Sequence, residues 1–469
     1  MVDDIATTSR QGDDMEIMDQ CLDSDKEEDE RTAFLRDLGV PFGLRHHLLH
    51  PESCAMERIW IIDNSGSMTL HDGHSSSHPN HSDTNTAFMT RWDEVQETTT
   101  VHVQLASALQ VPSEFRLLNT PDFVKKHQNE KRCFGLFQQT KQKKKKTNEF
   151  WVPETTTDSA MMVSNTDCCR VRFRVGHPKD DTPSLSGHTQ KKQQQKQVQH
   201  ATQLLHKIHK PKGKTPLANA IRQVGIELRH KQQQQQPTKD LSPVALMIVT
   251  DGSNNNEITT TSAGNDKASF LLQQLNQELV DALESLQDLP IHVVIRLCTD
   301  YQSMIEFYNH LDTQASCDPV PTTPFDTGDC DSNTSVASRH KNNRQQRLYN
   351  VDVLDDHLAE AKEVCASGNT WLNYALLFHR LREMGQSHEL FDLIDERALT
   401  KNEIQDFCQL LFGNSVLANE KNEDEADEIS SWQNFLDRVE RAQAKERMHW
   451  NPLTNQMAPW IDIGQLRQL

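Results

Sequence analysis

Short runs of apolar residues recur along the middle of the chain, and amphipathic helical stretches separate them. The clearest runs are MERIWIID (56–63), PVALMIVTDG (243–252) and PIHVVIRLCT (290–299). Runs of this kind are typical of strands buried on both faces of a parallel sheet. Because strands and helices alternate, we predict an α/β fold with a doubly wound, mostly parallel sheet that is covered by helices on both faces.

The other elements of this fold are expected from periodicity and alternation. Apolar residues at spacings of three and four indicate amphipathic helices. These helices are predicted at 91–110, 198–210, 212–230 and 267–289. SEFRLLN (113–119) is expected to form a second strand, and the alternating basic and apolar residues of VRFRVG (171–176) predict an edge strand.

Low hydrophobic content indicates that much of the chain lies outside a packed core. Only 35% of the 469 residues are hydrophobic, which is low for a globular protein. We predict, in chain order, a disordered acidic N-terminus (1–30), a short helical lead-in (31–55), an α/β domain (56–312), a disordered insertion (313–347), a helical extension (348–415), and an acidic linker with a C-terminal helix and tail (416–469). Low-complexity insertions within the α/β domain are expected at 69–90, 120–170, 178–197 and 231–240.

Charge and the lack of long apolar segments argue against several classes of protein. The formal net charge of -19 disfavours non-specific binding of nucleic acid. No apolar run reaches the length of a membrane span, and the N-terminal sequence lacks the apolar core of a signal peptide. The ten cysteines show no CxxC or zinc spacing, so we expect them to be reduced and structural. The expected location is cytoplasmic, with a nuclear location and the oligomeric state left open.

Three polar loops are expected at one edge of the sheet. DNSGS (63–67) directly follows one buried strand, TDG (250–252) ends another, and GKTP (213–216) precedes a helix. Open α/β sheets place their functional sites at the carboxyl ends of parallel strands. The three loops are therefore expected to meet there, although they are distant in sequence.

The side chains in these loops form an oxygen-only set of candidate metal ligands. The set consists of two carboxylates and three hydroxyls: Asp63, Ser65, Ser67, Thr215 and Asp251. Such a set, without histidine or cysteine, suits a hard cation such as Mg²⁺ or Mn²⁺ in octahedral geometry. Gly66 lets the backbone turn tightly between the two serines. Neutral hydroxyls leave much of the ion's charge uncompensated, so the site is expected to accept a carboxylate from outside.

These loops resemble the metal-ion-dependent adhesion site of the von Willebrand factor A (vWA) domain. DNSGSM matches the D-x-S-x-S signature of that family, KTPL is similar to its second-loop threonine motif, and VTDG to its third-loop aspartate motif. The resemblance covers residues 56–312 with large insertions and implies a Rossmann-like vWA fold. It implies that Ser65 and Ser67 bind metal directly and that Thr215 binds directly when a ligand is present. Asp63 and Asp251 would act directly or through water.

The resemblance implies a binding protein whose metal ion accepts an Asp or Glu of a partner protein, and the N-terminal sequence described above leads us to expect that it is intracellular. No Ser/His/Asp set, P-loop, cysteine nucleophile or catalytic carboxylate pair stands in a credible setting, so no enzyme activity is expected. Two alternatives stay open. The chain could be a non-catalytic accessory subunit of an ATP-driven or other multi-protein complex, or a scaffold in which the metal is purely structural.

Weaker signals have competing interpretations. His71, His74, His78 and His81 could bind a borderline metal, but their low-complexity context favours a disordered insertion. Lys143 to Lys146 could form a nuclear-import or polyanion patch, and a solvated basic loop is favoured. The glutamine runs at 193–195 and 232–236 are expected in surface loops without fixed structure.

The C-terminal region is expected to be helical. FDLIDERALTKNEIQDF (391–407) lacks the spaced Asp/Asn residues and the central glycine of a calcium loop, so we assign it no metal. Thr400 and Glu403 instead predict a capping box at a helix start. A dense apolar cluster between Trp371 and Leu381 is expected to form the core of the extension, with a partner-binding helical module as the alternative.

Overall fold

The structure is a computed structural model that describes most of the elements expected from the sequence. The described residues are 30–50, 53–54, 56–73, 89–124, 171–176, 187–234, 242–252, 265–316, 350–386, 388–414 and 428–469. The predictions for His74, His78, His81 and Lys143 to Lys146 lie outside these residues, as do those for 1–29 and 317–349.

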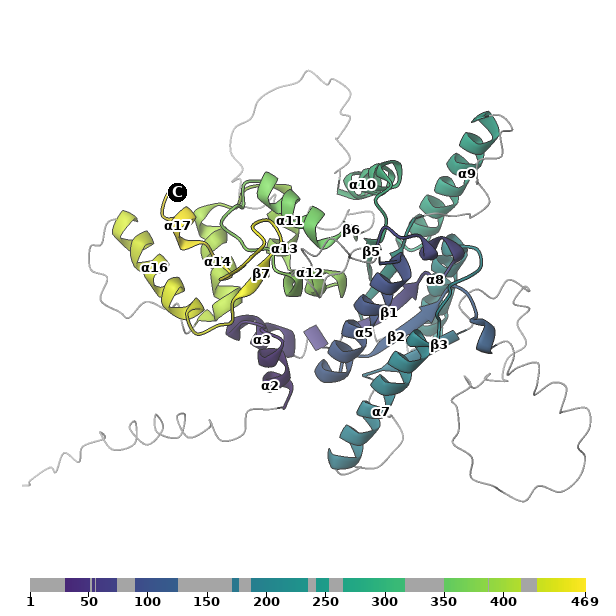
Figure 1. Cartoon of the computed structure of the whole chain (residues 1–469), viewed down its shortest axis with the longest axis horizontal. Helices are drawn as coiled ribbons and strands as arrows, with labels where there is room; N and C mark the ends of the chain where they lie inside the picture. Colours follow the sequence, from purple (N-terminus) through teal and green to yellow (C-terminus); the bar gives the residue numbers. More distant parts are fainter. Residues whose placement is uncertain are drawn as a thin grey trace, which may run out of the picture.

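A six-stranded mixed sheet forms the centre of the fold (Figure 1). Its spatial order is β3-β2-β1-β4-β5-β6. The strands are β1 (Glu57–Ile62), β2 (Ser113–Leu117), β3 (Val171–Val175), β4 (Val244–Thr250), β5 (Ile291–Leu297) and β6 (Asn350–Leu354). All neighbouring pairs are parallel except β2 and β3, which pair antiparallel at one edge. The predicted α/β class, the mostly parallel sheet and the edge position of β3 are confirmed.

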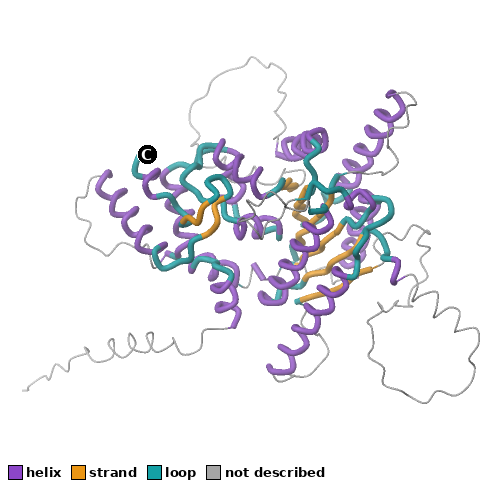
Figure 2. The backbone as a smooth tube through the Cα atoms, in the orientation of Figure 1, coloured by secondary structure: helices purple, strands orange, loops and turns teal. Residues whose placement is uncertain are grey.

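Helices cover both faces of this sheet (Figure 2). One face packs against α5 (Arg91–Leu109) and α7 (Gly187–His206). The other packs against α8 (Leu217–Gln234), α9 (Asn265–Glu284) and α10 (Gln302–Ser316). Side chains of β4 alternate between the two cores, with Met247 on the first side and Leu246 on the second. This double burial explains why β4 is apolar at every position up to Thr250.

The sheet continues into the predicted helical extension. Residues 350–354 were expected to begin that extension, and they form β6, which pairs parallel with β5. Their sequence NVDVL is short and only partly apolar, so its strand character depends on the partner that β5 provides. Helix α10 likewise crosses the predicted boundary at 312.

The glutamine-rich stretches were expected to be loops, and this prediction is wrong for the described residues. Residues 193–195 lie within α7, and α8 runs on to Gln234. Glutamine is a good helix former, so a run of glutamines can continue a helix that packing has already started.

The C-terminal region packs together with the helical lead-in. Its elements are α11 (His357–Ala366), α12 (Leu376–Glu383), α13 (Glu389–Glu396), α14 (Lys401–Phe412), α16 (Glu428–Gln443), β7 (His449–Asn451), β8 (Gln456–Ala458) and α17 (Ile463–Leu466). The lead-in forms α2 (Glu30–Asp37) and α3 (Phe42–Leu49), which are separated by a short break that contains Gly39 and Pro41. The Phe42 amide donates to Glu446 at 3.0 Å, and the two regions share one hydrophobic core with the first face of the sheet. The predicted capping box of Thr400 and Glu403 is confirmed.

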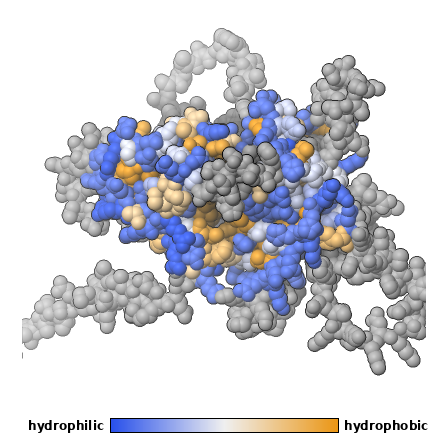
Figure 3. Space-filling model, viewed as in Figure 1, coloured by the Kyte–Doolittle hydropathy of each residue, from blue (hydrophilic) through white to orange (hydrophobic). Residues whose placement is uncertain are grey.

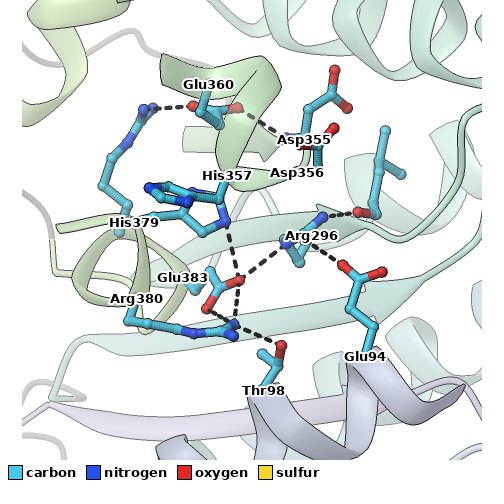
Figure 4. A network of polar contacts seen from close by, with 12 residues as sticks. Glu94, Thr98, Arg296, Asp355, Asp356, His357, Glu360, His379, Arg380 and Glu383 are labelled. Carbon is cyan, nitrogen blue, oxygen red and sulfur yellow. Dashed lines mark hydrogen bonds and ion pairs between the residues drawn. The ribbon is translucent and has the colours of Figure 1, made fainter. Parts of the chain in front are cut away.

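Charged side chains mostly lie at the surface, and the face shown in Figure 3 is largely hydrophilic with hydrophobic residues gathered near its middle. One group of buried charged side chains forms a network where α12 meets α5 and β5 (Figure 4). Glu383 accepts hydrogen bonds from Arg296 at 3.0 Å and from Arg380 at 2.8 Å, and it pairs with His102 at 2.9 Å. Arg296 also binds Glu94 at 2.6 Å. This network fastens the C-terminal helices to the sheet.

Candidate metal centre

The site begins where β1 ends, at a completely buried aspartate. The Asp63 amide donates to the Val249 carbonyl at 2.9 Å, so this residue continues the pairing of β1 with β4. Both carboxylate oxygens of Asp63 are held: Oδ1 accepts from the Ser65 amide at 2.9 Å, and Oδ2 accepts from Thr250 Oγ1 at 2.8 Å. Thr250 was not a predicted site residue, but its hydroxyl helps to orient the carboxylate of Asp63.

The two serine hydroxyls lie side by side above this carboxylate. A short 3-10 helix, Gly66–Thr69, turns the chain so that Ser65 Oγ and Ser67 Oγ are 3.0 Å apart. Neighbouring ligands of an octahedral Mg²⁺, each about 2.1 Å from the ion, are separated by roughly 3.0 Å. The spacing of the serine pair therefore suits two adjacent ligand positions.

Backbone hydrogen bonds join the second loop to the first. The Gly66 amide donates to the Gly213 carbonyl at 3.2 Å, and the Lys212 amide donates to the Asn64 carbonyl at 3.1 Å. Gly213 has φ +117°, and a Cβ there would lie 2.3 Å from Asn119 Oδ1, so this position requires glycine. The contacts bring Thr215 to the edge of the sheet that carries Ser65.

Asn64 and Asn119 act as a brace beneath these loops. Asn64 Nδ2 donates to the Asn119 carbonyl at 2.8 Å, and the Asn119 amide donates back to Asn64 Oδ1 at 2.7 Å. Asn119 Nδ2 also donates to the Lys214 carbonyl at 2.8 Å. This pairing of Asn64 with Asn119 was not predicted, because an asparagine in a D-x-S-x-S motif carries no signal for its distant partner.

Thr215 is the predicted ligand with the least explained environment. The residue is 4% exposed, and its Oγ1 atom is buried without a hydrogen-bond partner among the described residues. Leaving a buried hydroxyl unsatisfied costs about 1–3 kcal/mol. A ligand at this position would remove that cost.

The third loop places a second buried carboxylate beside the first. Asp251 is 1% exposed and directly follows β4. Gly252 has φ +73°, and its amide donates to Thr250 Oγ1 at 3.1 Å. A Cβ at Gly252 would lie 2.8 Å from Tyr308 Cε2, so the ring of Tyr308 packs directly beneath the turn.

Two buried carboxylates shape the electrostatics of the site. Burial, and then the charge of Asp251, raise the pKa of Asp63 to about 7. Burial also raises the pKa of Tyr308, and Asp251 and Asp63 raise it further. Two neighbouring buried carboxylates repel each other, and a divalent ion between them would relieve this repulsion.

A buried arginine enters the site from α5. Arg91 Nη1 donates to Asp251 Oδ2 at 2.8 Å, and Arg91 Nε donates to Asp72 Oδ1 at 2.6 Å. Neither Arg91 nor Asp72 was a predicted site residue. The only local signal was the helix start, which the structure confirms as a capping box of Thr90 and Asp93.

The five predicted ligands therefore come to one edge of the sheet, at the point where its strand order reverses. Chain order runs outward from β1 to β2 and β3 on one side, and then from β4 to β6 on the other. Such switch points are where open α/β sheets bind ligands. The carboxylates, the serine pair and the unpartnered hydroxyl of Thr215 together fit a hard divalent cation.

The structure gives less support to the other candidate sites. His71 is exposed at the base of the histidine-rich segment. Within the described ranges, no three His, Cys, Asp or Glu side chains gather as a metal-binding group. The stretch 391–407 forms α13 and α14, and a groove of about 910 Å³ lies between these helices and α3, lined by residues that include Phe42, His388 and Asp406.

A comparison of the sequence with models of protein families gave no match. A comparison with characterised proteins gave no significant similarity. In the part of the chain that the structure describes, no helix is both long and apolar enough to cross a bilayer.

Proposed function

We propose that this chain is a vWA-type binding protein that holds Mg²⁺ or Mn²⁺ at Asp63, Ser65, Ser67, Thr215 and Asp251. One observation carries the proposal: the Ser65 and Ser67 hydroxyls, 3.0 Å apart, share an edge of the sheet with two buried carboxylates and the unpartnered hydroxyl of Thr215. When bound, the ion would offer an open position to a carboxylate. The proposed ligand is therefore an Asp or Glu side chain of a partner protein.

Each proposed ligand would have a separate role in binding the ion and the partner's carboxylate. Ser65 and Ser67 would supply neutral oxygens that leave the ion's charge available to an incoming anion. Asp63, held at both oxygens, would keep its position when the ion arrives. Asp251 would balance the charge from the opposite loop.

We propose binding without catalysis. The Ser65 hydroxyl contacts the Ser67 hydroxyl and the Asp63 carboxylate, and we assign all three groups to the ion as ligands. A role as an accessory subunit of a larger complex, including an ATP-driven one, is compatible with the same site and differs only in the partner.

The sharpest test of the metal site is Thr215→Val. Valine has nearly the same shape, and the hydroxyl it removes has no partner among the described residues, so the metal-free protein should keep its stability. Mg²⁺ affinity, measured by calorimetry and by the rise in Tm with Mg²⁺, should fall about tenfold or more, which corresponds to about 1.4 kcal/mol.

Thr99→Val is the matched control. Thr99 lies in α5, is also buried, and its Oγ1 likewise has no partner among the described residues. This variant should bind Mg²⁺ as the wild type does. Wild-type protein whose Tm and calorimetric trace do not respond to Mg²⁺ or Mn²⁺ would contradict the proposal.

Asp251→Ala separates partner binding from a purely structural metal. If the ion receives a partner carboxylate, proteins pulled down from lysate in Mg²⁺ should be lost both in chelator and with this variant. A Glu or Asp of the captured protein should be required for its binding. If the metal only braces the loops, Tm should fall while the captured proteins stay the same.

A further inference from the structure

The candidate site contains a positive charge of its own. Arg91 is 1% exposed, and its guanidinium binds Asp251 at 2.8 Å on one side and Asp72 at 2.6 Å on the other. The guanidinium also lies 5.1 Å from the centre of the Tyr301 ring. An arginine buried among these groups is fixed in position, since each contact limits its rotamers.

These contacts connect three separate parts of the chain. Arg91 begins α5, Asp251 directly follows β4, and Asp72 follows the 3-10 helix that carries Ser67. The Arg91 amide also donates to the Leu70 carbonyl at 3.0 Å. Arg91 thus connects the loop that contains Asp251 to the chain segment that follows the loop of Ser65 and Ser67.

We propose that Arg91 is an internal counter-ion that limits the metal affinity of the site, a proposal that rests on the function proposed above. Without a metal, its charge compensates Asp251. With a metal, Asp251 is shared between two cations that repel each other across one carboxylate. Metal binding must therefore overcome the charge of Arg91, and the ion that does bind receives less charge from Asp251.

A purely structural role for Arg91 predicts the opposite result. If the residue only positions Asp251, its loss should disorder a ligand and weaken metal binding. If its charge dominates, its loss should strengthen metal binding, because the charge of Arg91 then no longer competes with the ion for Asp251. The sign of the change in affinity distinguishes the two roles.

The experiment compares Arg91→Met with Arg91→Lys in the full-length chain. Methionine keeps much of the unbranched stem but loses the charge, whereas lysine keeps the charge. We expect Arg91→Met to bind Mg²⁺ and Mn²⁺ roughly tenfold more tightly than wild type in calorimetry, and to have a lower Tm in chelator. Arg91→Lys keeps the charge but loses the paired hydrogen bonds to Asp72, so its metal affinity should stay closer to that of wild type than the affinity of Arg91→Met does.

Asp72→Asn provides a second variant if Arg91→Met does not fold. Asp72 is only half-buried, with its side chain 28% exposed, and it is not a proposed ligand. Removing its charge leaves the charge of Arg91 less compensated, so Mg²⁺ affinity should fall. Arg229→Met is the control for loss of a cation, because Arg229 lies in α8 and forms an ion pair with the exposed Asp288, which follows α9. Its Mg²⁺ affinity should equal that of wild type.

The outcomes separate this inference from the proposed function. If wild type binds Mg²⁺ and Arg91→Met binds it equally or more weakly, the counter-ion role of Arg91 is wrong and the metal site stands. If wild type, Arg91→Met and Arg91→Lys all fail to respond to Mg²⁺ or Mn²⁺, the metal site itself is wrong.

Discussion

Replacing Glu383 with glutamine should destabilise the whole protein by about 3–5 kcal/mol, the usual cost of removing one partner from a buried ion pair. The side chain of Glu383 is 1% exposed, and those of Arg296 and Arg380 are each 4% exposed. Although burial opposes ionisation, Arg380 and His379 hold the pKa of Glu383 well below its usual range. Glutamine keeps the shape but leaves the positive charges of the two arginines without this compensation.

The assay is urea unfolding followed by tryptophan fluorescence. Trp60 and Trp92 report on the sheet and α5, whereas Trp371 and Trp460 report on the C-terminal region. Because Glu383 links these regions, we expect one transition that moves to lower urea concentration at both sets of tryptophans.

Asp288→Asn is the control for this prediction, since Asp288 forms an ion pair with Arg229 but its side chain is 62% exposed. Exposed pairs contribute at most about 1 kcal/mol. The reasoning about burial is refuted if Glu383→Gln costs no more than Asp288→Asn. Independent unfolding of the sheet and the C-terminal helices in the wild type would refute the coupling between them.

Three further predictions concern the site and the same interface. Asp63→Asn should stabilise the metal-free protein at about pH 8. The folded pKa of Asp63 is raised to about 7, so the stability of the wild type falls by up to about 4 kcal/mol as the pH rises from about 4 to about 7. Urea titrations in chelator should show this decline in the wild type only. Burial lowers the pKa of His379 to about 3, so below about pH 6.5 this histidine binds a proton in the unfolded chain but not in the folded protein. Stability should therefore fall by about 1.4 kcal/mol per pH unit as the pH drops below about 6.5. Parallel profiles of stability against pH for wild type and His379→Gln would argue against this. Gly252→Ala should cost about 1–3 kcal/mol in thermal unfolding, because the residue has φ +73° and the new Cβ would lie 2.8 Å from Tyr308; an unchanged Tm would contradict it.

Much of the fold was predictable because its strands are buried on both faces. The apolar runs that contain β1, β4 and β5 need no distant partner to be recognised, since double burial leaves nearly every position apolar. β6 was missed for the converse reason. Its sequence NVDVL is short and mixed, and it is a strand because β5 offers it an open edge.

The candidate site shows the same division. Its five oxygen-bearing residues stand in short motifs whose spacing is visible along the chain. Arg91 stands in no such motif, and Thr250 stands in VTDG without any signal for its partner. Their roles come from contacts with Asp251 and Asp63, respectively, across large separations in sequence. Local patterns do not report such pairings.

The sequence by itself determined the class of fold and the residue types of the three loops proposed to bind metal, because apolar runs and motif spacing act over a few residues. Only the tertiary structure decided that the C-terminal helices share one core with the sheet and that Glu383 is held by Arg296 and His102. It alone placed Arg91 beside Asp251. The physical reason is that burial of a charge depends on which distant segments exclude water from it, and this is settled only when those segments pack.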